Sequence, residues 1–472
     1  MRPELRAAPV SYQALDAAGA LLTQKAPQAE KWSISLPQRG GDNIVISWLS
    51  PEGNSHKTGR MTLDPESGRE LVIRDTRGGD FLYTFHFQLY YFPWWIGRLL
   101  ICVATLAMLV AILTGVITHK KVFTDFFQLR FGKGQRSWLD SHNITAVLAL
   151  PFHLMITYTG LVTLLFTLMP WAISANFQSA DAFYQAAYPP APKIERSDRL
   201  AASLPLSELV ARASAFHDDL VPRWIDITNP GDASAIIGIL PGLDGLAAPR
   251  DTIFLSAITG EQIQPPITVG GARATQNAMI DLHAGRFSGP MLRWLYFLSG
   301  IGGTVMVATG LVLWTVKRRA RLPDPARPHF GFRLVERLNI GVIAGAPAGI
   351  AVYFLANRLL PLDMANRAEW EINSLFIVWG GLFVWTLARP AKRAWMEALA
   401  ACAALYALVP VVNALTTERG LISSLIARDW VYVGFDLVML AMAATCTLTT
   451  WKVATYQSKA TPRRKGGVAV EA

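Results

Sequence analysis

The sequence is short of cysteine, and the positions of its few cysteines restrict what the protein can be. The 472 residues include 3 cysteines, and each falls inside a long hydrophobic run: Cys102, Cys402 and Cys446. A disulfide framework is excluded, because no cysteine lies in a segment that could face an oxidising compartment. The paired spacing that zinc or an iron–sulfur cluster requires is missing too. No Gly-x-Gly-x-x-Gly loop lies outside the hydrophobic runs, so we expect no Rossmann unit for a nicotinamide or flavin.

Charged residues are also scarce, at 17% of the chain, whereas hydrophobic residues make up 52%. A membrane-spanning helix needs roughly 20 consecutive apolar residues, and soluble proteins seldom contain several such runs. The runs predict spans at Trp94–Ile117, Asn143–Met169, Leu292–Val316, Ile340–Leu360, Ile372–Leu387, Met396–Leu415 and Trp430–Thr450. Pro347 and Pro361 are compatible with lipid where neighbouring helices satisfy the freed backbone groups.

The basic residues lie just beyond the ends of these runs. The net charge of +10 therefore reflects membrane topology, and we expect no nucleic-acid partner. Four groups follow the first, third, fifth and last spans: Lys120, Lys121, Arg130, Lys133 and Arg136; Lys317, Arg318, Arg319 and Arg321; Arg389, Lys392 and Arg393; Lys459, Arg463, Arg464 and Lys465. We expect all four groups, and with them the C-terminus, to face the cytoplasm.

This topology places residues 1–92 on the outer side of the membrane. Seven spans with an inward C-terminus require an outward N-terminus, yet neither a signal peptide nor a span precedes this polar segment. From the sequence we expect that the chain starts at an internal methionine and that one N-terminal span is missing.

Two polar segments, residues 1–92 and 171–289, show the same order of elements. Each has a short amphipathic helix, then alternating residues typical of strands, then a glycine turn. After each turn come a histidine in an apolar setting, a span with a Thr-Gly pair, and basic residues. We therefore predict two small helix-plus-sheet domains produced by duplication. The elements are expected at Tyr12–Pro27, Trp32–Leu36 and Ile44–Trp48, and at Ser207–Phe216, Trp224–Thr228, Ala235–Leu240 and Asp251–Leu255, with turn glycines at Gly68 and Gly260.

Five of the 8 histidines lie at or within the spans. His86 and His283 mark the outer ends of the first and third spans, whereas His119 marks the inner end of the first. His142 and His153 share the second span, eleven residues apart. Eleven residues is close to three helical turns, so we expect both rings to point the same way, about 16 Å apart. The other three lie in polar stretches and are interpreted as surface residues: His56, His217 and His329.

Ionisable residues inside a membrane are costly and usually functional, and neutral imidazole is a common axial ligand of haem iron. The five histidines therefore suit two haem groups stacked across the bilayer; the alternative for any one of them is an interfacial anchor. Arg98 and Arg293 lie where they could pair with haem propionates, or could extend to the interface. The three Thr-Gly pairs are predicted sites of close helix packing.

Several stretches resemble the PepSY-associated transmembrane helix family over at least residues 12–320. They are Gly115-Val-Ile-Thr-His-Lys-Lys-Val-Phe-Thr-Asp-Phe-Phe127, Arg136-Ser-Trp-Leu-Asp-Ser-His142-Asn, Leu150-Pro-Phe-His-Leu-Met-Ile-Thr-Tyr-Thr-Gly160 and Asp281-Leu-His283. The resemblance implies iron-regulated inner-membrane proteins of Gram-negative bacteria, some of them haem-containing ferric-siderophore reductases. Full-length members begin with a span that has its own Leu-His motif, followed by a periplasmic PepSY domain.

We therefore expect a mainly α membrane protein, a helical transmembrane bundle with two small α+β PepSY-like periplasmic domains. The expected parts are a PepSY-like domain at 1–92, two spans with a cytoplasmic loop at 93–170, a second PepSY-like domain at 171–289, a third span at 290–320, and a four-span region with a cytoplasmic tail at 321–472.

The expected activity is electron transfer from a quinol or cytoplasmic reductase to a periplasmic ferric siderophore. Electrons would enter at an inner haem b held by His119 with His142 or His153. They would leave from an outer haem b held by His86 and His283, with His153 as an alternative on one side. Two other hypotheses are a siderophore or metal-ion transporter, which a broken, symmetric helix pair near mid-membrane would favour, and a non-catalytic anchor whose outward domains bind peptides or proteases.

Overall fold

The computed structural model describes residues 4, 9–37, 43–52, 55–119, 121, 124, 126–188, 192–216, 220–242, 251–264 and 270–456. Among the predicted basic groups, Lys120, Lys459, Arg463, Arg464 and Lys465 lie outside these residues, as does His217. The chain divides into two compact units, Met1–Val316 and Lys317–Ala472, and each is described by itself.

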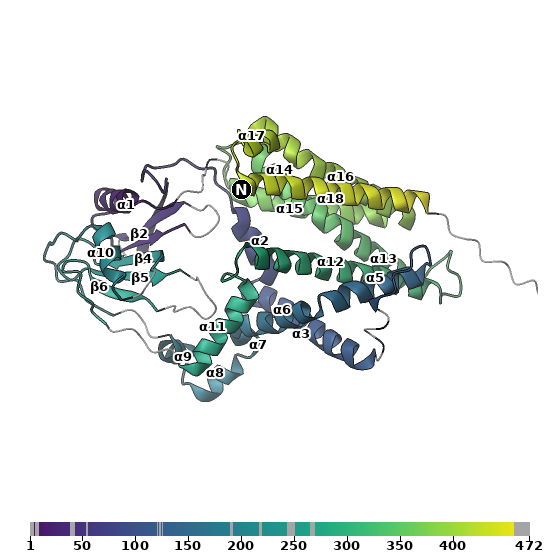
Figure 1. Cartoon of the computed structure of the whole chain (residues 1–472), viewed down its shortest axis with the longest axis horizontal. Coiled ribbons are helices and arrows are strands. Elements are labelled where there is room, and N and C mark those ends of the chain that lie inside the picture. The colour runs from purple at the N-terminus through teal and green to yellow at the C-terminus, as the bar shows by residue number, and fades with distance from the viewer. Residues whose placement is uncertain are drawn as a thin grey trace, which may run out of the picture. The chain divides into compact units, whose positions relative to one another are not determined.

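The described part of the chain contains six helices that are long and apolar enough to cross a membrane. They are α3 (Trp94–Thr118) and α12 (Pro290–Arg319) in the first unit, and in the second unit the continuous segment Phe330–Leu359, α15 (Arg367–Leu387), α16 (Ala391–Thr416) and α18 (Trp430–Thr455). These helices confirm six of the seven predicted spans and a mainly helical protein (Figure 1).

The second predicted span is broken. It consists of α5 (Gln135–Leu148) and α6 (Leu150–Thr163), whose axes differ by 68°, and the short α7 (Leu165–Leu168) follows. Pro151 lies in the first turn of α6 and has no N–H with which to continue the hydrogen bonds of α5, so the helix is interrupted there. The prediction that His142 and His153 occupy one straight helix, about 16 Å apart along its axis, is therefore wrong.

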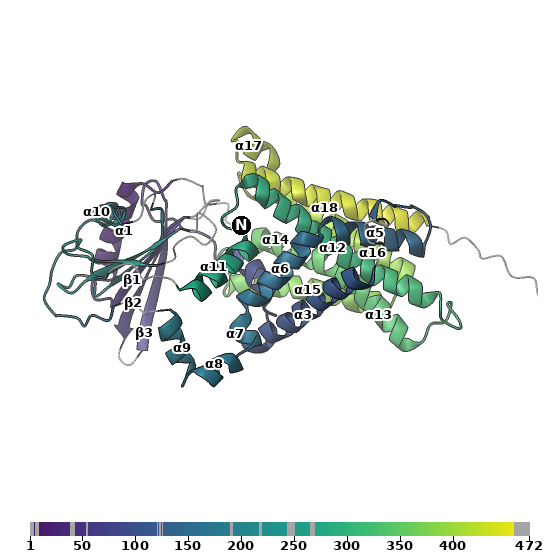
Figure 2. The same ribbon diagram turned by 60° about the horizontal axis from the view of Figure 1, so that its bottom comes forward.

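The two polar segments, predicted as separate domains, contribute to one six-stranded antiparallel sheet of order β3-β2-β1-β4-β5-β6. The first segment supplies β1 (Lys31–Ser35), β2 (Ile44–Glu52) and β3 (Ser55–Leu63), and the second supplies β4 (Pro222–Thr228), β5 (Ile236–Pro241) and β6 (Ile253–Ser256). The prediction of two separate domains is corrected by the pairing of β1 with β4, in which Trp32 lies opposite Ile227 and Ile34 opposite Ile225. Each three-stranded half alone would leave an edge of unpaired backbone groups, and the pairing of β1 with β4 satisfies both edges. Figure 2 shows β1, β2 and β3 side by side in the sheet.

The predicted duplication is confirmed in the order of the elements. Each half of the sheet carries one helix, α1 (Tyr12–Lys25) or α10 (Leu206–Ala213), and Leu15, Leu22 and Leu209 belong to the core that these helices share with the strands. The helices are joined by Asp16, whose carboxylate accepts hydrogen bonds from the N–H and hydroxyl of Ser207. After the sheet come a histidine-bearing helix and a span in both halves: α2 (Gly78–Phe87) then α3, and α11 (Gly271–Ala284) then α12.

The second unit is a helix bundle. Its first span combines α13 (Phe330–Ile340), the π-helical turn η1 (Gly341–Gly345) and α14 (Ala346–Leu359), so that Pro347 is accommodated at the start of α14 and Pro361 follows its end. The short α17 (Leu421–Ile426) links α16 to α18. Lys392 donates to the carbonyl of Tyr456, which places the start of α16 and the end of α18 at the same end of the bundle.

The two turn glycines occupy the same conformation. Gly68 has φ +70° and Gly260 has φ +72°, and the N–H of each donates to the carbonyl four residues earlier, that of Asp64 or Ser256. A Cβ on Gly68 would lie 2.7 Å from the Cβ of Ala17 on α1. Glycine is therefore required there both by the left-handed backbone and by the approach of the helix.

We predict that Gly68→Ala loosens the sheet more than Gly231→Ala does. Both glycines have positive φ, so each alanine costs about 1 kcal/mol of backbone strain. Gly231 has open space beside it, whereas Gly68 contacts α1, and this overpacking adds about 1–3 kcal/mol. Hydrogen exchange of peptides from α1 and β3 in the purified full-length protein measures the difference. Equal exchange rates in the two variants would contradict the role of the α1 contact.

Candidate functional site

Three histidine rings in the first unit each place a ring nitrogen next to a backbone carbonyl oxygen of another helix. His142 Nδ1 lies 2.9 Å from the carbonyl oxygen of Met306, and His283 Nδ1 lies 3.0 Å from that of Ile156. His153 Nε2 makes a longer contact, 3.4 Å, with the carbonyl of Ser299. Each ring thus bridges two helices: α5 to α12, α11 to α6, and α6 to α12.

In all three cases a glycine lies four residues after the carbonyl, at Gly310, Gly160 and Gly303. A Cβ added there would lie 3.2 Å from His142 Cε1, 2.9 Å from His283 Cε1 or 3.1 Å from His153 Nε2. A helix carbonyl already accepts the N–H four residues on, but its oxygen has a second lone pair. The missing Cβ lets the imidazole reach that lone pair from the side.

These contacts fix the tautomers of the rings. A carbonyl only accepts hydrogen bonds, so the nitrogen that faces it carries a proton, and in a neutral ring the other nitrogen keeps its lone pair. In His142 and His283 that other nitrogen is Nε2. This arrangement is typical of metal-binding histidines, whose second nitrogen donates to a backbone carbonyl.

The histidines lie at successive levels along the helices. Ser299 and Met306 are two turns apart on α12, about 10 Å, so His153 and His142 contact the same side of that helix at two levels. His283 contacts α6 one turn beyond His153. The His86 ring lies next to it, with 6.2 Å between the two ring centroids and 33° between the planes. We call His142, His153, His283 and His86 the histidine ladder.

The surroundings of His283 favour its neutral form. Burial lowers its pKa, the neighbouring His86 lowers it further, and the hydrogen bond to Ile156 only partly opposes these effects. His86 itself is exposed near the end of α2. Neutral imidazole is the form that binds a metal.

The structure places the remaining predicted residues at helix ends. His119 follows α3, where its N–H donates to Gly115, and it is not part of the histidine ladder. Arg98 donates to Gln88 and lies over Phe87, so it holds the corner between α2 and α3. Arg293 donates to the carbonyls of Ser288 and Arg286 at the equivalent corner between α11 and α12. His329, expected at the surface, is exposed and caps α13 by accepting the N–H of Phe332.

Sequence reasoning found two of the three ladder glycines, as members of Thr-Gly pairs, but assigned them to helix packing. Gly160 and Gly310 contact histidine rings, whereas Gly115 of the third pair has open space beside it. Gly303 was missed, although its spacing of two helical turns from Gly310 is a signal that could have found it. Charged residues buried in the second unit were also missed. Arg367 and Glu371 stand just before the predicted span Ile372–Leu387, and Asp436 is a single acid within the predicted span Trp430–Thr450.

Among the described residues, no three His, Cys, Asp or Glu side chains converge closely enough to hold a metal ion. The ladder therefore offers imidazoles singly or in pairs.

Comparison with known proteins agrees with the division of the chain. A family model described as the PepSY-associated TM region matches residues 1–317, which include the whole first unit, Met1–Val316. The uncharacterized protein PA4219 of Pseudomonas aeruginosa is 27% identical over 393 residues, a match that covers 79% of this chain and 94% of that protein.

We predict that Gly160→Ala and Gly310→Ala displace His283 and His142 from their carbonyls. The added methyl group would overpack each contact at a cost of about 1–3 kcal/mol. The matched control is Gly115→Ala, which alters the third Thr-Gly pair where space is open and gains helix propensity. Thermal unfolding of the purified protein should show lower midpoints for the first two variants only. A similar midpoint for all three variants would show that the ring contacts are unimportant.

Proposed function

The chain belongs to the PepSY-associated TM region family, and on that premise we propose that it is an inner-membrane haem protein that moves electrons outward to ferric siderophore iron. The observation that carries the proposal is the histidine ladder. In it, backbone carbonyls orient imidazole rings at successive levels of the membrane helices, and a glycine beside each carbonyl lets the ring approach.

The residues fit haem b better than a metal ion bound by side chains alone. Haem needs only one or two axial ligands from the protein, because the macrocycle supplies the rest, and the ladder offers imidazoles singly or in pairs. At each glycine the ring lies where a Cβ would collide with it, so the imidazole is held in a defined position on the facing helix. His86 and His283 lie close enough to reach one iron and would hold an outer haem. His142 or His153, with His119, would hold an inner haem.

Bound haem b supplies a one-electron carrier. The protein contributes the orientation of the ligands: Met306 and Ile156 accept the Nδ1 protons and so direct Nε2 of His142 and His283 away from the backbone. Partial burial lowers the pKa of His283 and so favours the neutral ring. Arg98 and Arg293 fix the corners that set the height of His86 and His283, and their remaining N–H groups are available to propionates.

The partners of this proposal follow from the topology. Basic residues near the ends of α3, α12 and α15 would face the cytoplasm together with the C-terminus, and the sheet domain would lie in the periplasm. The donor would be a quinol or a cytoplasmic reductase near His142, and the acceptor a ferric siderophore near His86. Reduction releases the iron because siderophores hold ferrous ion weakly.

One observation favours a second function, transport of a siderophore or metal ion. Transporters often bind substrate at discontinuous helices, and α5 and α6 form such a helix, broken between His142 and His153. The described residues contain a single broken pair, however, and not the symmetric pair expected of an inverted repeat.

An absorption spectrum tests the proposal. The purified protein, oxidised and then reduced with dithionite, should show the sharp bands of low-spin bis-histidine haem. His142→Ala and His283→Ala should each remove about half of the signal, because they would act on different haems. The control is His329→Ala, an exposed histidine outside the ladder, which should leave the spectrum unchanged.

A protein without these bands, isolated from haem-replete cells, would contradict the haem proposal and favour transport. Haem bands that persist in both ladder variants would show that other residues are the ligands.

A further inference from the structure

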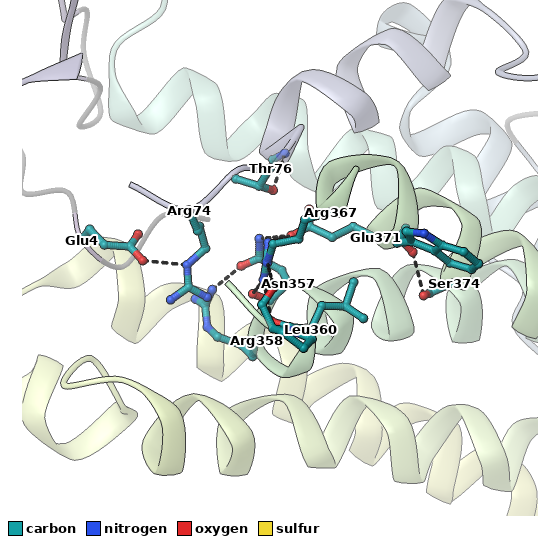
Figure 3. A network of polar contacts seen from close by, with 12 residues as sticks. Glu4, Arg74, Thr76, Asn357, Arg358, Leu360, Arg367, Glu371 and Ser374 are labelled. Atoms are coloured by element: carbon teal, nitrogen blue, oxygen red, sulfur yellow. Dashed lines mark hydrogen bonds and ion pairs between the residues drawn. The ribbon is translucent and has the colours of Figure 1, made fainter. Parts of the chain in front are cut away.

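The second unit contains buried ionisable side chains that electron transfer through the ladder does not use. Arg367 and Glu371, one turn apart on α15, are both 0% exposed and form an ion pair. Arg367 also donates to the carbonyls of Asn357 and Pro361, and the amide of Asn357 donates to Glu371 (Figure 3). Both charges are thus compensated, and the pair secures the turn between α14 and α15.

A second chain of contacts begins at the neighbouring Arg358 and leads into the bundle. Arg358 Nε donates to Asn413 Oδ1 on α16 at 2.6 Å, and Asn413 Nδ2 donates to Asp436 Oδ1 on α18 at 3.0 Å. Asn413 is 1% exposed and Asp436 is 0% exposed. The other carboxyl oxygen of Asp436, Oδ2, is buried and has no hydrogen-bond partner among the described residues.

The contrast between the two buried carboxyls is informative. Glu371 contacts a guanidinium and an amide directly, as an ionised carboxylate requires. Asp436 receives one amide hydrogen bond, and the nearest guanidinium, Arg358, is separated from it by Asn413. An ionised carboxylate with an unsatisfied oxygen in an apolar interior is very costly, and such a group becomes neutral by binding a proton.

The groups around Asp436 support this state. From α14 the facing charge is Arg358, from α16 the nearest polar group is the neutral amide of Asn413, and α17 carries no ionisable residue. Ionisable side chains within a membrane bundle are rare and mark proton or ion paths. Arg358 is half-buried at the C-terminal end of α14. The hydrogen bonds from Asp436 through Asn413 to Arg358 therefore lead from the buried carboxyl to that end of the bundle, opposite the loop between α15 and α16.

We propose that Asp436 is a proton-binding site. It binds a proton as a neutral carboxylic acid inside the second unit and exchanges that proton at the bundle end marked by Arg358 and Asn413. The site needs no haem, so it stands or falls separately from the electron-transfer proposal.

Carbodiimide labelling tests the proposal in the purified full-length protein. Dicyclohexylcarbodiimide modifies protonated carboxyls in apolar surroundings, and mass spectrometry identifies the modified peptide. Asp436 should be labelled, with a rate that falls about tenfold for each pH unit above its titration midpoint. Glu371 and Asp429, which are paired with Arg367 and Arg419, are internal controls that should stay unlabelled.

The isosteric variant Asp436→Asn should lose this label, and in infrared spectra it should lose a carboxylic C=O band that Glu371→Gln retains. Absence of label and band at Asp436 while the protein remains folded, or equal labelling of Glu371, would overturn the proposal. A shift of the band on transfer to deuterated water would support exchange, whereas a band that never shifts would overturn it.

Discussion

The contact between a histidine ring and a helix carbonyl, made where a glycine follows four residues later, determines most of the arrangement in the first unit. Within lipid nearly every backbone group is already paired inside its own helix, so a side chain from another helix can reach a carbonyl only where no Cβ stands in the way. The device recurs at Gly160, Gly303 and Gly310. Each contact sets at once the distance between two helices, the height of a ring and the nitrogen that keeps its lone pair.

Duplication explains why the same parts occur twice and also where the halves differ. Each half supplies a helix, three strands, a glycine turn, a histidine-bearing helix and an arginine at the corner before a span. The halves do not remain separate, because β1 and β4 are the free edges of their respective sheets and each completes the hydrogen bonding of the other. On α12 the glycine of the Thr-Gly pair receives His142, while on α3 the equivalent glycine faces open space.

Local features were predictable from the sequence. Hydrophobic length located six of the seven spans, and the positions of Gly68 and Gly260 identified equivalent turns. Three features depended on information that periodicity does not contain. Pro151 interrupts a helix although the hydrophobic pattern continues through it. Strands β1 and β4 pair although α3, α5 and α6 lie between them in the sequence. Asp436 is a single acid in an otherwise apolar segment. The tautomers of His142 and His283 could not be predicted either, because they depend on which carbonyl of the facing helix each ring contacts.

The sheet has a consequence for how the protein is made. Strand β1 is synthesised long before β4, and two membrane crossings, α3 and the broken α5–α6, lie between them in the chain. The edge of β1 in the first half of the domain must therefore stay unpaired until those helices have been inserted and the chain has returned to the same side of the membrane. Such non-local pairing is slow and exposes an aggregation-prone edge during biogenesis. Completion of the sheet thus reports that the first membrane helices have reached their correct orientation.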